Sequence, residues 1–231
     1  MTIRSPLPPV TLLLLLLSGC SALPPTTSQA AREQAWQRHQ QTLASLEQWQ
    51  LVGRIALIDE SQAWHARIDW QQQQQRYTLR LTGPLSQGSL ELRGTPQQVV
   101  LRDADGERVA TDPAQLLAAE VGWQVPVAAL RYWVLGLPDP TQPAQRQLND
   151  SGHLTQLQQA RWQIRFSDYQ PYAQYTLPTQ LHASSADGSV KLIISQWQPG
   201  AMPPPAPPIT PRFRWPTPPS SATTPQSNGS R

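Results

Sequence analysis

The stretch AWHARIDW at residues 63–70 decides the fold class of this chain, because its apolar and polar side chains alternate. Trp64, Ile68 and Trp70 fall on one side of an extended backbone, whereas His65 falls on the other. Successive side chains of a β-strand point to opposite faces, so this pattern is typical of a strand with one buried and one solvated face. The stretch therefore predicts a half-buried antiparallel strand.

The same period continues along the chain. RYTLRLT at 76–82 places Leu79 and Leu81 opposite arginines, and Leu90 and Leu92 alternate with polar residues after the next turn. Later apolar stretches of strand length lie at 99–101, 154–157, 162–166, 177–183 and 190–197. Their number and spacing predict an extended antiparallel sheet.

Turn signals separate these stretches. Asp105-Gly106, Asp150-Ser151-Gly152 and Asp187-Gly188 are combinations that favour tight turns. The five consecutive glutamines at 71–75 are interpreted as a loop between two strands, without a chemical role.

Three helices are expected. Residues 29–47 carry apolar side chains at helical spacing, and shorter helices begin at Asp112-Pro113 and at Val125-Pro126, the latter ending at Gly136. Strands before and after a helical pair suggest one curved sheet with a helical cover. The predicted fold class is mainly β with α: a single open, incompletely closed antiparallel β-barrel whose helices cover an apolar cavity.

The amino-terminal segment has the layout of a secretory signal peptide, with Arg4 followed by a short apolar run. Leu17-Ser18-Gly19-Cys20 resembles the bacterial lipobox, in which the cysteine receives a diacylglycerol and an acyl group. The alternative is a plain signal peptide whose cysteine falls there by chance. Cys20 is the only cysteine of the chain, which excludes an internal disulfide framework and favours lipidation.

Four segments are expected: a lipoprotein signal peptide at 1–19, a lipidated tether at 20–28, a folded domain at 29–197 and a Pro-rich tail at 198–231. Eleven prolines fall in the tail, whose composition predicts an extended, disordered segment. By resemblance to enterobacterial sorting, Ser21 in place of an aspartate indicates the outer membrane.

The charge of the chain lies mostly in its terminal segments. The formal charge is +3 and the pI about 9.4. Removing Arg4 and the three tail arginines from the 18 basic side chains leaves 14, against 15 acidic ones in residues 20–197. The domain is thus nearly neutral, and nucleic-acid binding is not expected.

No catalytic or metal-binding pattern is present in the sequence. His39, His65, His153 and His182 lack metal-ligand spacing, and there is no HExxH, GxSxG, Walker A or GxGxxG motif. These histidines are interpreted as solvated side chains on strand faces and turns. The chain is therefore not expected to be an enzyme or to hold a metal.

Two features leave alternatives open. The tryptophans, among them Trp133 and Trp162, suit either a packed core or the lining of an apolar cavity. Leu85 lies in the turn GPLSQG at 83–88, where it either plugs the end of the barrel or protrudes toward a membrane or partner.

Several motifs, each weak alone, occur together in a specific order: the lipobox at 17–20, GRIALI at 53–58, WHARIDW at 64–70, GPL at 83–85, LRYWVLGLP at 130–138, the turn at 150–152 and KLIISQW at 191–197. With these motifs the chain resembles the LolB family over residues 20–197. Members of that family are outer-membrane lipoproteins that accept other lipoproteins from the periplasmic carrier LolA.

The resemblance implies a monomer on the periplasmic face of the outer membrane, anchored by an N-acyl diacylglycerol on Cys20 and without another cofactor. Its expected partners are LolA, lipoprotein acyl chains and outer-membrane phospholipid. Leu85, flanked by Pro84 and Ser86, matches the protruding leucine that helps to place cargo into the membrane, although a glycine often stands where Ser86 does. The candidates for the acyl-chain cavity share an inward strand or helix phase: Trp64, Ile68, Trp70, Leu79, Leu81, Leu90, Leu92, Leu130 and Val134.

Two other functions remain possible from the residues alone. A structural or ligand-binding lipoprotein would have the same anchor but a solid core. A lipid-linked hydrolase would need a nucleophile and a base that converge in space.

Overall fold

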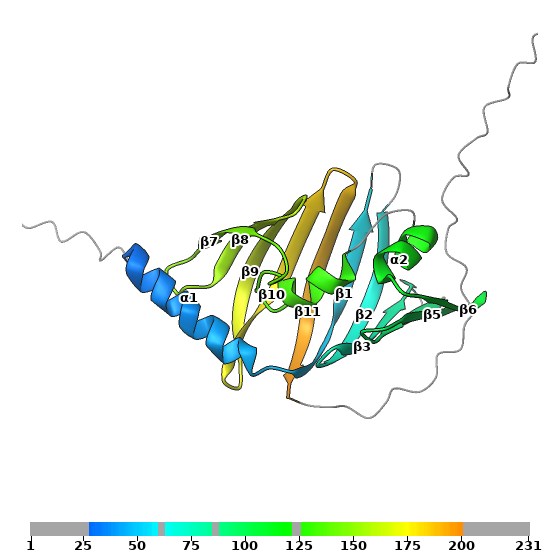
Figure 1. The fold of residues 1–231 in the computed structure, drawn as a ribbon, viewed down its shortest axis with the longest axis horizontal. Coiled ribbons are helices and arrows are strands. Elements are labelled where there is room, and N and C mark those ends of the chain that lie inside the picture. Colours follow the sequence, from blue (N-terminus) through cyan, green and yellow to red (C-terminus); the bar gives the residue numbers. More distant parts are fainter. Residues whose placement is uncertain (1–27, 60–62, 85–87, 122–125, 201–231) are drawn as a thin grey trace, which may run out of the picture.

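A computed structural model describes residues 28–59, 63–84, 88–121 and 126–200. Its body is one eleven-stranded antiparallel sheet with the order β6-β5-β4-β3-β2-β1-β11-β10-β9-β8-β7. The edge strands β6 and β7 do not pair, and Figure 1 shows them on opposite sides of the molecule. The predicted antiparallel architecture is therefore confirmed as an open sheet that does not close.

The helices are α1 (Gln29–Ala44), α2 (Pro113–Val121) and α3 (Val127–Trp133). The strands are β1 (Gln48–Ile58), β2 (Ala63–Gln73), β3 (Arg76–Thr82), β4 (Ser89–Gly94), β5 (Val99–Asp103), β6 (Gly106–Ala110), β7 (Ala144–Leu148), β8 (Leu154–Gln159), β9 (Trp162–Tyr172), β10 (Tyr175–Ser185) and β11 (Gly188–Pro199). Central β1 pairs with β2 on one side and with the last strand, β11, on the other.

The alternation in β2 divides the sheet into two faces. Ile68 and Trp70 are buried, whereas His65 and Arg67 are exposed. The buried side chains of the strands form one apolar cluster with residues of α1 and α3, which therefore pack on the same face. We call this the inner face and the opposite side the outer face.

The loop formed by the glutamine run is shorter than the sequence predicts. Strand β2 continues to Gln73, and only Gln74 and Gln75 form the turn. Gln72 pairs with Trp49 of β1 and is buried. The prediction of a loop over 71–75 was therefore wrong for its first three residues, because backbone pairing with β1 holds them in the strand.

Strand β7 was not predicted. Its sequence, AQRQL, has little apolar alternation because it lies at the edge of the sheet, where none of its side chains is fully buried. Pairing with β8 alone forms this strand.

The helix boundaries follow local capping. Ser28 accepts a hydrogen bond from the backbone N–H of Ala31, and Asp112 accepts one from the backbone N–H of Ala114 at 2.8 Å. The predicted stop at Gly136 is also present, since its N–H bonds the carbonyl of Trp133 at 2.8 Å. None of the helices in the described part of the chain is long and apolar enough to cross a membrane.

A bulge at the centre of the sheet explains the glycine of GRIALI. The β1–β11 register shifts between Val52 and Gly53. A Cβ atom at Gly53 would lie 2.3 Å from the carbonyl oxygen of Ile193. Only glycine permits this close approach of β1 to β11, which sets the local twist of the central strands.

Candidate functional site: the apolar inner face and its helical cover

The structure brings the nine cavity candidates together in one cluster on the inner face. All of them are buried except Trp64, which is half-buried against the cluster. Strands β2, β3 and β4 carry seven of them, and α3 with its C-cap carries Leu130 and Val134. The inward phase inferred from the sequence is therefore correct for these positions.

Helix α3 covers part of this face with its own apolar side. Val127, Ala129, Leu130 and Trp133 are buried against the sheet cluster. The indole of Trp133 packs against that of Trp162 with a centroid distance of 6.0 Å. A seven-residue helix is too short to be stable alone, so these contacts hold it in place.

A buried glutamine fastens the carboxyl end of α3 to the sheet. The side-chain oxygen of Gln159, at the end of β8, accepts bonds from the Trp133 indole and from the backbone N–H of Asp139, both at 2.9 Å. Its amide group donates to the carbonyls of Asp139 and Gln142 at 2.7 and 3.0 Å. Gln159 is only 2% exposed. The sequence offers no sign of this role, because its partners lie 17 to 26 residues away.

Three further tryptophans form the central part of the inner face. Trp49 lies between Trp70 and Trp197, with both centroid distances at 5.4 Å. The indole of Trp70 donates to Gln72, and that of Trp197 donates to the carbonyl of Pro178. Because the N–H groups of Trp70 and Trp197 are satisfied within the sheet, these two rings present mainly apolar surface to the rest of the cluster.

A pocket of about 520 Å³ adjoins this tryptophan cluster. Residues from the α1–β1 connection, the adjoining ends of β1 and β2, the β2–β3 turn and the α3 segment line it, including Leu46, Trp49, Gln72, Arg131, Tyr132 and Leu135. None of the nine cavity candidates is in this lining. The candidates fill the inner face with their own side chains, and the open space lies at the edge of α3.

One histidine prediction was wrong. His39 of α1 is not solvated but 9% exposed, and its ring meets that of His153 edge-on at a centroid distance of 4.7 Å. His153 in turn stacks on Tyr169 at 4.6 Å. Burial, followed by the nearby charge site of His153, lowers the pKa of His39 to about 4. The cluster packs α1 onto the sheet in its neutral form.

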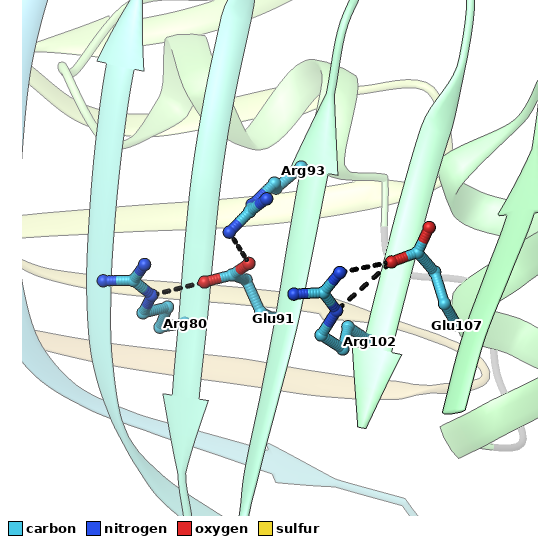
Figure 2. A network of polar contacts seen from close by, with 5 residues as sticks. All are labelled: Arg80, Glu91, Arg93, Arg102 and Glu107. Atoms are coloured by element: carbon cyan, nitrogen blue, oxygen red, sulfur yellow. Dashed lines mark hydrogen bonds and ion pairs between the residues drawn. The ribbon is translucent and has the colours of Figure 1, made fainter. Parts of the chain in front are cut away.

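The outer face also differs from expectation at Glu91. Its position in β4 predicts a solvated side chain, yet it is 1% exposed. Arg80 and Arg93 hold its two oxygens at 2.6 and 2.5 Å, as Figure 2 shows. Beside them Arg102 and Glu107 form a separate, more exposed pair. The arginine side chains that pair with Glu91 explain how a carboxylate can be buried on this face.

The predicted lipid-attachment site Cys20 and the predicted membrane-insertion residue Leu85 lie outside the described residues, as does Ser86. The base of the Leu85 turn is described: the N–H of Gly83 bonds the carbonyl of Gly88 at 3.0 Å, and Pro84 is exposed. Among described residues, no group of three or more metal-ligating side chains could hold an ion.

The open sheet and its few helices place the chain in a known fold class. The solved structure of a LolA superfamily protein from Nitrosomonas europaea aligns with a TM-score of 0.51, covering 78% of this chain and 96% of that one at 10% identity. The two chains thus share their overall fold.

Sequence comparison gives the family. A model described as outer membrane lipoprotein LolB matches residues 47–197. Outer-membrane lipoprotein LolB of Nitrosococcus oceani is 38% identical over 189 residues, covering 81% of this chain and 94% of that protein. Its namesake from Stutzerimonas stutzeri is 34% identical over 190 residues, covering 81% and 92%. The chain belongs to the LolB family.

Family membership confirms the functional class inferred from the sequence. The LolB family is the outer-membrane lipoprotein receptor of the lipoprotein localisation pathway and works with LolA. It is a transport receptor and not an enzyme, as predicted.

Proposed function

We propose that this chain accepts lipoproteins from LolA, shelters their acyl chains against the inner face beneath α3, and releases them into the outer membrane. The observation that carries the proposal is the cover itself: a short helix packed by Leu130 and Trp133 over an otherwise continuous apolar sheet face. Figure 1 shows that the sheet beneath is open at both edges.

The energetics require such a shelter. Burying an acyl chain is worth about 0.8 kcal/mol per CH₂ group, so a lipoprotein's chains cannot cross water exposed. The inner face is filled in this structure, and incoming chains must therefore replace contacts that α3 makes with the sheet. Inserting extra methylene groups into such a packed cluster typically costs about 1–3 kcal/mol, so the side chains of the inner face must repack around an acyl chain. The cost of displacing α3 thus offsets part of the free energy gained by burying the acyl chains. This cost keeps cargo binding weaker than insertion into a bilayer.

The anchor and the insertion loop complete the proposal. Cys20 carries an N-acyl diacylglycerol, and the tether 20–28 holds the domain, as a monomer, at the periplasmic face of the outer membrane. The exposed Pro84 turns the chain at the base of the loop whose Leu85 contacts membrane phospholipid. The apolar side chain of a leucine can enter the acyl region of the bilayer without burying a charged group there.

A second candidate is supported by the filled inner face. A structural outer-membrane lipoprotein without transfer activity would have the same anchor and a permanently solid core. The two functions differ in whether acyl chains can enter between α3 and the sheet.

Fluorescence quenching by brominated acyl chains tests this difference. Chains that enter beneath α3 approach Trp70 and Trp133, so the quenching should fall when these residues are replaced by phenylalanine. Trp36, which lies in α1 and is also buried, provides the matched Trp36→Phe control. Saturable quenching that depends on Trp70 and Trp133 supports the acceptor. Absence of saturable quenching favours the structural lipoprotein.

A further inference from the structure

Six outer-face positions at the centre of the sheet form a compact grid. Strand register places Arg67, Arg54 and Ile193 in one row, on β2, β1 and β11, and His65, Ala56 and Lys191 in the next. Neighbouring strands are about 4.8 Å apart and alternate residues about 7 Å apart, so the whole grid spans roughly 10 Å. The three cationic side chains of Arg54, Arg67 and Lys191 therefore stand close enough together to contact one small anionic group.

Within the described part of the chain these cations have no carboxylate partner. Arg54, Arg67 and Lys191 are exposed, and none of them forms an ion pair with a carboxylate of the described chain. Arg54 and Arg67 are direct cross-strand neighbours, an arrangement in which like charges destabilise a sheet. Asp69 follows Arg67 on the same face of β2, but its carboxylate is hydrogen-bonded by the Gln50 amide at 2.7 Å.

Positive charge continues to the neighbouring strand. His182 of β10 is the cross-strand partner of Lys191, and its ring nitrogen contacts the Arg165 guanidinium at 2.9 Å. Burial, then the charges of Arg165 and Lys191, lowers the pKa of His182. This part of the outer face thus has a positive potential that an anion would relieve.

The grid is also hollowed and partly apolar. A groove of about 450 Å³ is lined by Arg54, Arg67 and Lys191 together with Ala56, Ile193 and Pro84. Cations around an apolar floor suit an amphiphile with a charged head better than a free ion. Because Pro84 immediately precedes Leu85, the groove adjoins the loop proposed to enter the membrane.

We propose that this outer-face groove binds the phosphate headgroup of an anionic phospholipid. Arg54, Arg67 and Lys191 contact the phosphate, and Ala56, Ile193 and Pro84 contact the glycerol and the upper part of the acyl chains. Bound there, the lipid holds the outer face against the bilayer and sets the depth of the Leu85 loop. The groove is argued from its own geometry, and only its use in cargo insertion rests on the proposed function.

Photolabelling in vesicles tests the site. Membrane binding alone is uninformative, because the lipid anchor supplies it. The processed, lipidated chain is reconstituted in phosphatidylethanolamine vesicles containing phosphatidylglycerol with a photoactivatable headgroup, and the labelled peptides are identified by mass spectrometry. Labels should appear on the β1, β2 and β11 segments around Arg54, Arg67 and Lys191, and should weaken as salt screens the charges.

A double variant and a matched control decide the result. Arg54→Gln/Lys191→Gln should lower the labelling about tenfold or more, because each cation near an anionic surface contributes to lipid attraction. The thermal midpoint should be unchanged or slightly raised, since the like-charge pair of Arg54 and Arg67 is removed. Arg38→Gln/Arg76→Gln removes two exposed arginines elsewhere, from α1 and from the far end of β3, and should keep full labelling. Equal labelling in both variants, or an equal loss in both, overturns the proposal.

Two further outcomes separate this proposal from others. If the double variant keeps its labelling but no longer captures cargo from LolA, the groove binds an acidic protein surface and the lipid proposal is overturned. If the chain is labelled as expected yet never accepts cargo, the groove stands and the proposed function fails.

Discussion

The indole of Trp133 in α3 donates a 2.9 Å hydrogen bond to the side chain of Gln159 at the end of β8. The same glutamine oxygen accepts from the backbone N–H of Asp139, so one buried amide joins the cover helix, the segment after it and the sheet. One end of α3 is thereby fixed, and any opening of the cover would take place about that end.

Replacing this glutamine should destabilise the domain. Gln159→Ala leaves the Trp133 indole and a buried backbone N–H without partners, and each buried unsatisfied group costs about 1–3 kcal/mol. We expect a loss of roughly 3 kcal/mol in the free energy of unfolding, measured by urea denaturation. Gln158→Ala, at the exposed neighbouring position of β8, should change it by less than about 0.5 kcal/mol. Similar losses in the two variants would contradict the fastening role.

Stability should fall as the pH falls from about 6.5 to 4. The folded chain holds the pKa of His39 at about 4, below its usual 6.5, so in this window the unfolded chain binds a proton that the folded chain does not. The stability that comes from keeping His39 neutral is therefore complete above pH 6.5. The free energy of unfolding decreases from there by up to about 3 kcal/mol toward pH 4. His39→Leu should remove most of this dependence, as judged by urea midpoints at pH 7 and 5.

The control for the histidine is His65→Gln, because His65 is exposed on the outer face. That variant should keep the pH dependence of the parent. If His39→Leu retained the full dependence, the buried ring pair would not be its source.

Strand pattern predicts most of the sheet but not its less typical parts. In β2 and β3 one face is buried, so burial itself creates the alternation that the sequence displays. The edge strand β7 lacks this signal. Composition alone assigns Gln72 to a loop, yet its pairing with Trp49, 23 residues away in the sequence, holds it in a strand.

Long-range contacts limit what can be inferred about the site. The inward phase of the cavity candidates follows from period, but the partners of Gln159 and the burial of His39 depend on elements brought together only by the fold. Glu91 is similar, because the arginines that pair with it come partly from the neighbouring strand β3. Opening of the inner face depends on the free-energy difference between a closed and an open position of α3. An alternation pattern reports only which side chains are buried in the closed one.

The loop proposal predicts a separation of two steps. Leu85→Glu should leave folding and the capture of cargo from LolA largely intact, because the apolar inner face is unchanged. Insertion of cargo into vesicles should be blocked, since a carboxylate at the loop tip resists entry into the acyl region. Gln87→Glu adds the same charge two residues away and should insert cargo nearly normally. Normal insertion by Leu85→Glu would remove the assignment.

The anchor proposal concerns Cys20. Cys20→Ala should yield protein with no lipid-modified mass and with loss of stable membrane association, because the thiol is the only site for the diacylglycerol. Intact-mass spectrometry of protein extracted from cells makes the measurement, and any remaining acylation would contradict the proposal. Position 20 precedes the described residues, which begin at 28, and we expect the circular dichroism spectrum to be unchanged.

Transfer of a lipoprotein from purified, loaded LolA tests the central claim most directly. After mixing, the cargo should co-purify with this chain and leave LolA, and should then move into added vesicles in a reaction that Leu85→Glu stops at the second step. Cargo that remains on LolA when the chain is folded and in excess would contradict the account.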